Sequence, residues 1–381
     1  MSSYVVVGTW NTKGEELDFL CDEIGRLGHR AIKLDASSQV VSDSRDASIS
    51  AAKDRAVEKL KDIMEKEEIA GAAAVGGGTL LFMAVGIMEN LPLLMPKVIV
   101  STMVANSLPA FRSHKDITYI QSPCDFGALN PLSKSVLENA ARALTAMKEG
   151  LPEMERGAIA ITAIGIMGVY TEEIKAFWRE KNFALVPFHS AGESTMAMAE
   201  LGRANFFSGI LDLALHDVID YVALGAYGNI NRERLRSYLS MDVPAVIAPG
   251  AVDAVAFVPK DNSVPPRFRK RNLYRHDFRW AFKTTRREAV EAARWIGGIV
   301  EETKPEHMLF LIPLKGWSYP GDEGKSFYDP ALMEAFQKQL RRFVRDDQLV
   351  AVDLSINDPR FGIMASQRLC DLMERKSRAP E

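Results

Sequence analysis

The sequence predicts an α/β protein with two doubly wound domains and mainly parallel sheets. Its 381 residues exceed what one compact core usually holds. Short, continuous apolar runs alternate with longer amphipathic runs, which is the pattern of parallel strands separated by helices. A polar segment, 149–157, interrupts this alternation and contains two glycines and a proline. We therefore expect two domains, 1–152 and 153–381.

Five apolar runs in the first domain predict buried strands, and the amphipathic runs between them predict helices. The predicted strands are Tyr4–Gly8, Ala31–Asp35, Ala70–Val75, Lys97–Ser101 and Ile117–Gln121. One helix is predicted to begin at Lys13, because Thr12 and Glu15 have the spacing of a capping box. The other predicted helices are Asp46–Glu65, Leu80–Met88 and Ser133–Lys148.

The second domain repeats the alternation of strands and helices. The predicted strands are Ala158–Ile164, Ala184–Phe188, Ile219–Leu224, Ala245–Ala248, Met308–Ile312 and Leu349–Leu354, and one helix is predicted at Thr171–Arg179. His216 and Asp217 are expected on the solvated face of a helix, with Asp212 one turn before them. A metal site at this spacing is the less favoured alternative.

Composition and charge exclude several classes of protein. The chain has 47 basic and 50 acidic residues, so its net charge of −3 provides no overall attraction for nucleic acid. Three cysteines lie far apart, which excludes a disulfide scaffold and a thiolate zinc site. No apolar stretch is long enough to span a bilayer. We expect a cytoplasmic protein that binds neither membranes nor nucleic acid.

Two strand-to-helix loops of the first domain predict a phosphate site. Gly8, Thr9, Thr12 and Lys13 follow the first strand, and the run Gly76–Thr79 follows the third. Helix N-termini and glycine-rich loops at the carboxyl ends of parallel strands favour bound phosphate. Ordinary connecting loops with a surface lysine are the alternative. Asp35 ends the second strand, where a dinucleotide fold places a ribose-binding carboxylate, but no GxGxxG motif is present.

These loops and other short stretches resemble the Tm-1-like ATP-binding family, once catalogued as the uncharacterised family UPF0261. The similar stretches of the first half are Gly8–Leu17, Gly76–Thr79, Pro96–Thr102 and Asn130–Lys134. Those of the second half are Phe188–Gly192, Gly209–Leu213, Pro249–Asp253, Arg271–Tyr274, Pro313–Gly316, Phe327–Pro330 and Ile356–Pro359. The resemblance covers nearly the whole chain and implies two Rossmann-like domains, ATP with Mg²⁺ in the first domain, and a homodimer.

The resemblance also implies which residues contact the nucleotide. These are Gly8, Thr9, Thr12, Lys13, Asp35, Gly76, Gly77, Gly78, Thr79, Ser101 and Thr102. Asn11 and Asn106 belong to the same loops and are included in the expected site. The family usually has an aspartate where Asn11 stands and a glycine where Asn106 stands. We therefore expect Mg²⁺ to bridge the phosphates with few ligands from the protein itself, and we predict no metal-binding residue.

Candidate catalytic residues of the second domain lie near predicted strand ends. His189 and Glu193 could act as an acid–base pair, and His276 and Lys315 could transfer protons or stabilise charge. Glu193 could equally be an exposed acid near a helix N-terminus, and Lys315 could be solvated. Arg271 and Asn272 are candidate substrate residues in the basic and aromatic stretch 265–287, although a solvated or dimer-interface loop would need neither.

The sequence therefore favours an ATP-binding protein, with an ATP- and Mg²⁺-dependent enzyme as the leading hypothesis. Its substrate is expected to be a small anionic or carbonyl compound bound in a cleft between the domains. One alternative is a non-catalytic module that binds another protein under the control of a nucleotide. The other is a lyase or hydrolase that works without a nucleotide in the second domain.

Overall fold

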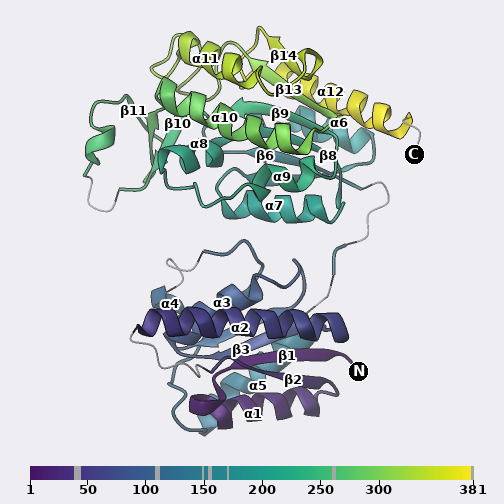
Figure 1. Ribbon diagram of the computed structural model, residues 1–381, viewed down its shortest axis with the longest axis vertical. Helices are drawn as coiled ribbons and strands as arrows, with labels where there is room; N and C mark the ends of the chain where they lie inside the picture. Colours follow the sequence, from purple (N-terminus) through teal and green to yellow (C-terminus); the bar gives the residue numbers. More distant parts are fainter. Residues whose placement is uncertain are drawn as a thin grey trace. The chain divides into compact units, whose positions relative to one another are not determined.

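The computed structural model divides the chain into two compact units, Met1–Pro152 and Glu153–Glu381 (Figure 1). It describes residues 1–37, 44–107, 112–147, 150–152, 157–169, 171–259 and 263–378. Within these ranges, no helix is both long and apolar enough to cross a membrane. Each unit is an α/β structure with its own parallel sheet, which confirms the predicted fold class.

The first unit contains a five-stranded sheet in the order β2-β1-β3-β4-β5, and all its strand pairs are parallel. The strands are β1 (Ser3–Gly8), β2 (Arg30–Asp35), β3 (Gly71–Gly76), β4 (Lys97–Ser101) and β5 (Thr118–Gln121). The helices are α1 (Trp10–Arg26), α2 (Arg45–Lys66), α3 (Gly78–Met88), α4 (Val104–Ser107) and α5 (Pro131–Ala146).

Helices cover both faces of this sheet because successive strand residues point to opposite sides. Val5 and Val7 pack with α2 and α3, whereas Val6 packs with α1 and α5. Figure 1 shows α2 and α3 on one face and α1 and α5 on the other. The strand β3 is buried along its whole length, as expected for a central strand between two helical layers.

The second unit contains a six-stranded parallel sheet in the order β14-β13-β9-β8-β6-β7. Its strands are β6 (Ala158–Ala163), β7 (Ala184–His189), β8 (Phe207–Ala214), β9 (Ala245–Gly250), β13 (Met308–Pro313) and β14 (Leu349–Val352). Its α-helices are α6 (Glu172–Glu180), α7 (Glu193–Arg203), α8 (His216–Ala223), α9 (Glu233–Leu239), α10 (Arg286–Thr303), α11 (Pro330–Leu340) and α12 (Pro359–Arg378). Two short 3₁₀ helices are η2 (Pro266–Phe268) and η3 (Asp346–Gln348).

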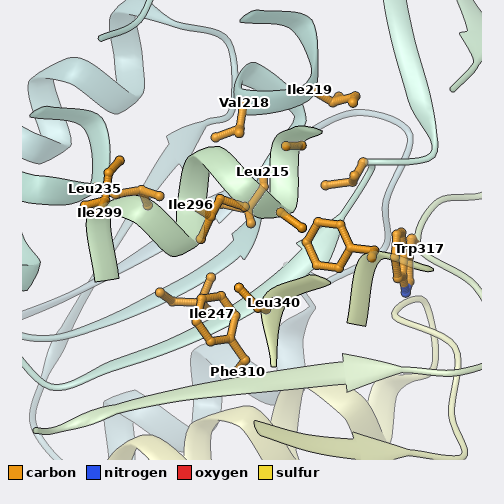
Figure 2. Packing of buried hydrophobic residues seen from close by; sticks show 14 of the residues in the cluster. Leu215, Val218, Ile219, Leu235, Ile247, Ile296, Ile299, Phe310, Trp317 and Leu340 are labelled. Carbon is orange, nitrogen blue, oxygen red and sulfur yellow. The ribbon is translucent and has the colours of Figure 1, made fainter. Parts of the chain in front are cut away.

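A large apolar cluster fills the space between one face of this sheet and helices α7 to α11. Figure 2 shows its centre, where Ile247 and Phe310 of the sheet meet Ile296 of α10 and Leu340 of α11. A second cluster on the opposite face includes Trp178 of α6 and Leu369 of α12. The second sheet is therefore also covered by helices on both faces.

Two parts of the second unit differ from the sequence-based prediction. The run Ile219–Leu224 was predicted as a strand but belongs to α8, which ends where Leu224 adopts a left-handed conformation with φ of 55°. The neighbouring strand β8 was not predicted, because Asp212 interrupts its apolar run. A small antiparallel sheet was also missed, with β10 (Ala254–Phe257), β11 (Leu273–Arg275) and β12 (Trp280–Lys283) in the order β10-β12-β11.

Candidate functional site

The first unit has a cavity of about 380 Å³ at the carboxyl ends of β1 and β3. These neighbouring strands lie where the strand order reverses, since β2 continues the sheet on one side and β4 on the other. Ligands of doubly wound sheets bind at this position. The lining residues are Thr9, Asn11, Thr12, Lys13, Ala36, Arg45, Ser48, Ile49, Ala52, Gly76, Gly77, Gly78, Thr79, Leu80 and Met83.

The loop after β1 folds differently from the prediction. Helix α1 begins at Trp10 instead of Lys13, because the carbonyl of Thr9 accepts the backbone N–H of both Thr12 (3.0 Å) and Lys13 (2.9 Å). The hydroxyl of Thr12 hydrogen-bonds to that of Thr9 at 2.8 Å, in place of the predicted capping box with Glu15. Lys13 then interrupts the helix with φ of −135° and ψ of 28°. The residue at this break, Lys13, also lies in the wall of the cavity.

The loop after β3 presents backbone amides to the same cavity. Helix α3 begins at Gly78, and its N-cap residue Gly77 has no side chain that could accept a hydrogen bond. The amides of the first turn of a helix have no acceptor within the helix itself. An added Cβ at Gly77 would meet no atom within 4 Å. The loop therefore leaves space and N–H donors for an anionic group.

Positive charge dominates the lining of this cavity. Lys13 and Arg45 are its only ionisable residues within the described ranges, and neither has a carboxylate beside it in the lining. The Lys13 ammonium lies 4.0 Å from Asp125, whose side chain is 81% exposed and therefore screens it weakly. Arg45, at the start of α2, was not predicted. No sequence signal distinguishes it from other surface arginines.

Five of the predicted nucleotide contacts do not line the cavity: Gly8, Asp35, Ser101, Thr102 and Asn106. Gly8 is required for packing, since a Cβ there would lie 2.4 Å from the side chain of Leu17. Asp35 accepts hydrogen bonds from the Ser37 hydroxyl (2.5 Å) and the Trp10 N–H (3.3 Å). Partial burial raises the pKa of Asp35, but these bonds outweigh it and hold the pKa below its usual value.

The other three predicted contacts outside the cavity lie at or beyond the end of β4: Ser101, Thr102 and Asn106. The hydroxyl of the buried Ser101 accepts the N–H of Met103 at 3.2 Å, and the carbonyl of Thr102 accepts the side chain of Gln121 at 2.8 Å. Asn106 is exposed on the short helix α4. These bonds organise the loop after β4, next to the loop after β3, without reaching the cavity.

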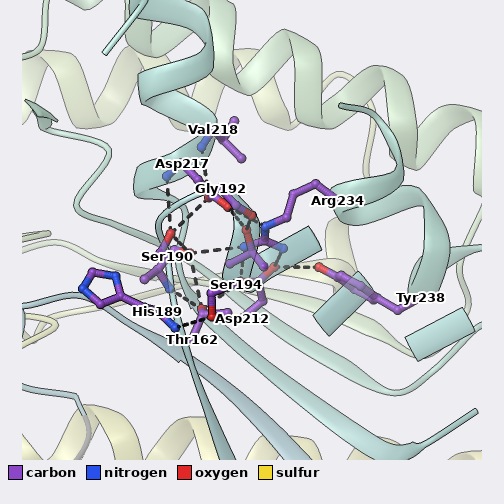
Figure 3. A network of polar contacts seen from close by, with 12 residues as sticks. Thr162, His189, Ser190, Gly192, Ser194, Asp212, Asp217, Val218, Arg234 and Tyr238 are labelled. Carbon is purple, nitrogen blue, oxygen red and sulfur yellow. Dashed lines mark hydrogen bonds and ion pairs between the residues drawn. The ribbon is translucent and has the colours of Figure 1, made fainter. Parts of the chain in front are cut away.

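A buried polar network supports the loop after β7 in the second unit (Figure 3). The guanidinium of Arg234 binds both carboxylate oxygens of Asp212 (2.7 and 2.8 Å) and one of Asp217 (2.8 Å). All three side chains are fully buried. Asp217 in turn accepts a hydrogen bond from Ser190 at 3.0 Å, directly after His189. The predicted solvated position of His216 and Asp217 is therefore wrong, and Asp212 lies on β8.

Figure 3 shows His189 at the edge of this network, at the end of β7. The pKa of His189 is lowered by desolvation and by the positive charge of Arg279. Arg279 and His276 line a second, small cavity of about 30 Å³ together with the buried His216. The structure thus brings the predicted residues His189 and His276 into one neighbourhood with His216, which the sequence analysis had placed at the surface.

His276 lines this small cavity, whereas His189 and the other candidates of the second unit do not. Glu193, in the first turn of α7, accepts a hydrogen bond from Asn229 at 3.0 Å. Lys315 pairs with Asp353 at 2.8 Å, and this hydrogen bond raises the pKa of the lysine. Arg271 forms a bidentate ion pair with Glu288, and both of its hydrogen bonds measure 2.8 Å. Asn272 donates to the carbonyl of Ser326 at 2.6 Å.

Comparisons with known proteins identify the family. The N-terminal domain of the uncharacterised protein family UPF0261 matches residues 36–152, and its C-terminal domain matches residues 156–373. A UPF0261 protein of Clostridium tetani is 32% identical over 402 residues, covering 97% of this chain and 99% of that protein. A UPF0261 protein of Rhizobium meliloti is 31% identical, covering 95% and 96%.

Two further similarities are more distant. The ToMV resistance protein Tm-1 of Solanum lycopersicum is 27% identical over 309 residues, which cover 78% of this chain and 41% of that protein. Among solved structures, a conserved domain protein of Vibrio cholerae aligns at 12% identity over 82% of this chain and 88% of that chain, with a TM-score of 0.21. The relatives confirm the resemblance to Tm-1-like proteins, and the two matching domains show that this chain belongs to the UPF0261 family.

Proposed function

We propose that the first unit binds ATP in the cavity between the loops after β1 and β3. The observation that carries this proposal is the combination of glycine amides, Lys13 and Arg45 around 380 Å³ of space at the point where the strand order reverses. A cavity of this size lies within the usual range for small-molecule sites. Its two cations and free amides complement a chain of phosphates.

The lining residues divide into two kinds that suit the two ends of a nucleotide. Lys13, Arg45, Thr79 and the amides of the α3 N-terminus would hold the phosphates, because they are donors or cations. Ile49, Ala52, Leu80 and Met83 supply an apolar wall suited to an aromatic base.

The residues around the cavity fit a phosphate chain better than they fit a directly bound metal ion. The Ser37 hydroxyl donates to an oxygen of Asp35 at 2.5 Å and lies 3.0 Å from the side-chain oxygen of Asn11, so all three groups belong to one hydrogen-bonded cluster. Within the described ranges, no three acidic, histidine or cysteine side chains are grouped to hold a metal. A magnesium ion would then be held mainly by phosphate oxygens, whose charge it would partly neutralise.

Calorimetric titration with ATP, with and without Mg²⁺, tests the proposal. Lys13→Ala removes a charged donor, so we expect affinity to fall roughly 10- to 100-fold, the effect of a charge-assisted hydrogen bond. Lys61→Ala is the matched control, because Lys61 is an exposed lysine of α2 that pairs with Glu58 outside the cavity. Equal ATP affinity of the two variants and the unmodified protein would contradict the assignment.

Our leading hypothesis for the use of ATP is a reaction on a small anionic or carbonyl substrate. Nucleotide-dependent turnover would support this enzyme. Nucleotide-dependent affinity for a protein would instead support a gated binding module, a role compatible with the tomato relative's name as a resistance protein. Turnover without nucleotide would support a lyase or hydrolase of the second unit, and the small histidine-lined cavity favours this version. Homodimerisation stays a prediction, to be tested by light scattering.

A further inference from the structure

The second unit has its own position where the strand order reverses. Strand β6 lies between β7 and β8, and the chain passes to β7 on one side before it returns to β8 on the other. The small cavity lies beyond the carboxyl ends of these strands, with Ile164, Gly165 and Ile166 following β6 and His216 following β8. This is the position that ligands occupy in doubly wound sheets. We call this cavity the histidine pocket.

The lining of the histidine pocket is cationic and lacks a carboxylate. Its ionisable residues are His216, Tyr227, His276 and Arg279, and Ile164, Ile166 and Trp280 make part of its apolar wall. Arg279 binds Asp277 through its Nε atom at 2.9 and 3.1 Å and through its Nη2 atom at 2.5 Å, although Asp277 lies outside the lining. A guanidinium has five N–H donors, so this pairing leaves donors for a second anion.

The buried imidazole of His216 has a ring nitrogen without a hydrogen-bond partner among the described residues. Its relative exposure is 2%, and its Nδ1 atom has no hydrogen-bond partner there. The carboxylate of Asp220 is 3.9 Å from this nitrogen and accepts the backbone N–H groups of Tyr227 (2.9 Å) and Ala256 (2.8 Å) instead. Burial lowers the pKa of His216 to about 3, so the ring is neutral at physiological pH. An unsatisfied buried imidazole costs stability unless a ligand or water binds it.

The volume of the pocket limits what can enter it. About 30 Å³ accommodates roughly one water molecule or one small polar group, far less than a nucleotide. The pocket therefore fits the end of a ligand, while the remainder would lie outside it. A carboxylate matches both this size and the planar donors of Arg279.

We propose that the histidine pocket binds the carboxylate end of a small organic acid, held by Arg279 and His276 and contacted by neutral His216. This site belongs to the second unit and does not depend on ATP binding in the first. Arg279 would supply positive charge and the donors that Asp277 leaves free, the exposed His276 would supply a second polar group, and the buried His216 a polar contact inside the pocket.

The test is a titration of the full chain, labelled with ¹³C in its histidine rings, with acetate, oxalate and malonate at constant ionic strength. The chain has six histidines, and His216→Gln and His276→Gln assign the two relevant signals. We expect at least one acid to shift both signals saturably. Arg279→Gln should weaken this binding at least tenfold, whereas Arg269→Gln, an exposed arginine of the same basic stretch, should leave it unchanged. Failure of all three acids to produce saturable shifts, or unchanged binding by Arg279→Gln, would overturn the proposal.

A second variant blocks the pocket without changing its charge. A Cβ at Gly165 would lie 2.9 Å from the Nε2 atom of His276, at the flexible end of that side chain. We expect Gly165→Ala to fold and to lose at least tenfold in affinity for the acid. Its ATP affinity should stay unchanged, which separates this site from the one in the first unit. Acid binding by Gly165→Ala with the affinity of the unmodified protein would also overturn the proposal.

Discussion

Adding one methyl group at each of two adjacent glycines, Gly76 and Gly77, distinguishes what folding requires from what ligand binding requires. At Gly76 the new Cβ would lie 2.6 Å from the Cδ2 atom and 2.8 Å from the Cβ atom of the buried Leu80. Overpacking of this kind usually costs about 1–3 kcal/mol. In a unit of this size, that corresponds to a fall of roughly 2–12 °C in melting temperature.

At Gly77 the same methyl group would meet nothing within 4 Å. Its φ of −84° and ψ of −165° suit alanine. Alanine makes the unfolded chain less flexible than glycine does, which stabilises the folded state by roughly 0.4–1 kcal/mol. Alanine is a poorer N-cap residue than glycine, which offsets this gain. We expect a net change in stability within about 1 kcal/mol. The methyl group would nevertheless occupy space at the cavity lining, where the phosphates are proposed to lie.

Urea unfolding and calorimetric titration with ATP, applied to both variants, make the comparison. Gly76→Ala should lower the unfolding midpoint of the first unit, whereas Gly77→Ala should keep it and lose at least tenfold in ATP affinity. Folded Gly77→Ala that binds ATP as tightly as the unmodified protein would show that the ligand does not approach this loop. Gly76→Ala with the stability of the unmodified protein would show that Leu80 moves away from the added methyl group without cost.

Two further predictions concern buried charge in the second unit. Arg234→Met leaves the buried carboxylates of Asp212 and Asp217 without their guanidinium, so we expect a loss of about 3–5 kcal/mol in urea unfolding. Arg236→Met, on the exposed side of the same helix, should cost less than about 1 kcal/mol, and equal losses would contradict this account. Burial raises the pKa of Asp253 to about 7. The folded state therefore holds a proton that the unfolded state releases near pH 4, so stability falls as pH rises from about 4 to about 7, by at most about 1.4 kcal/mol per pH unit. Asp253→Asn should remove this part of the pH dependence between about pH 5 and 7, and an unchanged pH profile of the variant would contradict the role of Asp253.

Local patterns predicted most elements of the first unit because its strands are short, continuous apolar runs. Val5, Val6 and Val7 are buried on both faces of the sheet, which produces a clear strand signal. The strand β8 lacks such a signal, since Asp212 lies within it and is stabilised by Arg234 and Tyr238 of α9 and by Thr162 of β6. A charge inside a strand becomes acceptable only when a partner from elsewhere in the chain reaches it.

The candidate sites were predictable to different degrees. The loops around Lys13 and Gly77 carry helix-start and glycine signals, and both line the cavity of the first unit. The contribution of Arg45 comes from α2, which no local signal connects to these loops. In the second unit, His216 and Asp217 were expected on a solvated helix face, yet both are buried. The burial of Asp217 depends on other elements, because Arg234 of α9 and Ser190 of the loop after β7 donate hydrogen bonds to it.

The alternation of strands and helices and the glycine-rich loops can be read from the amino-acid sequence alone. Both depend on the period of apolar residues and on backbone freedom, which act over a few neighbouring residues. Which charges are buried as pairs, and which side chains line each cavity, depends on how the chain folds in three dimensions. The cost of burying a charge depends on partners that distant segments bring within hydrogen-bond distance, as Arg234 shows between Asp212 and Asp217.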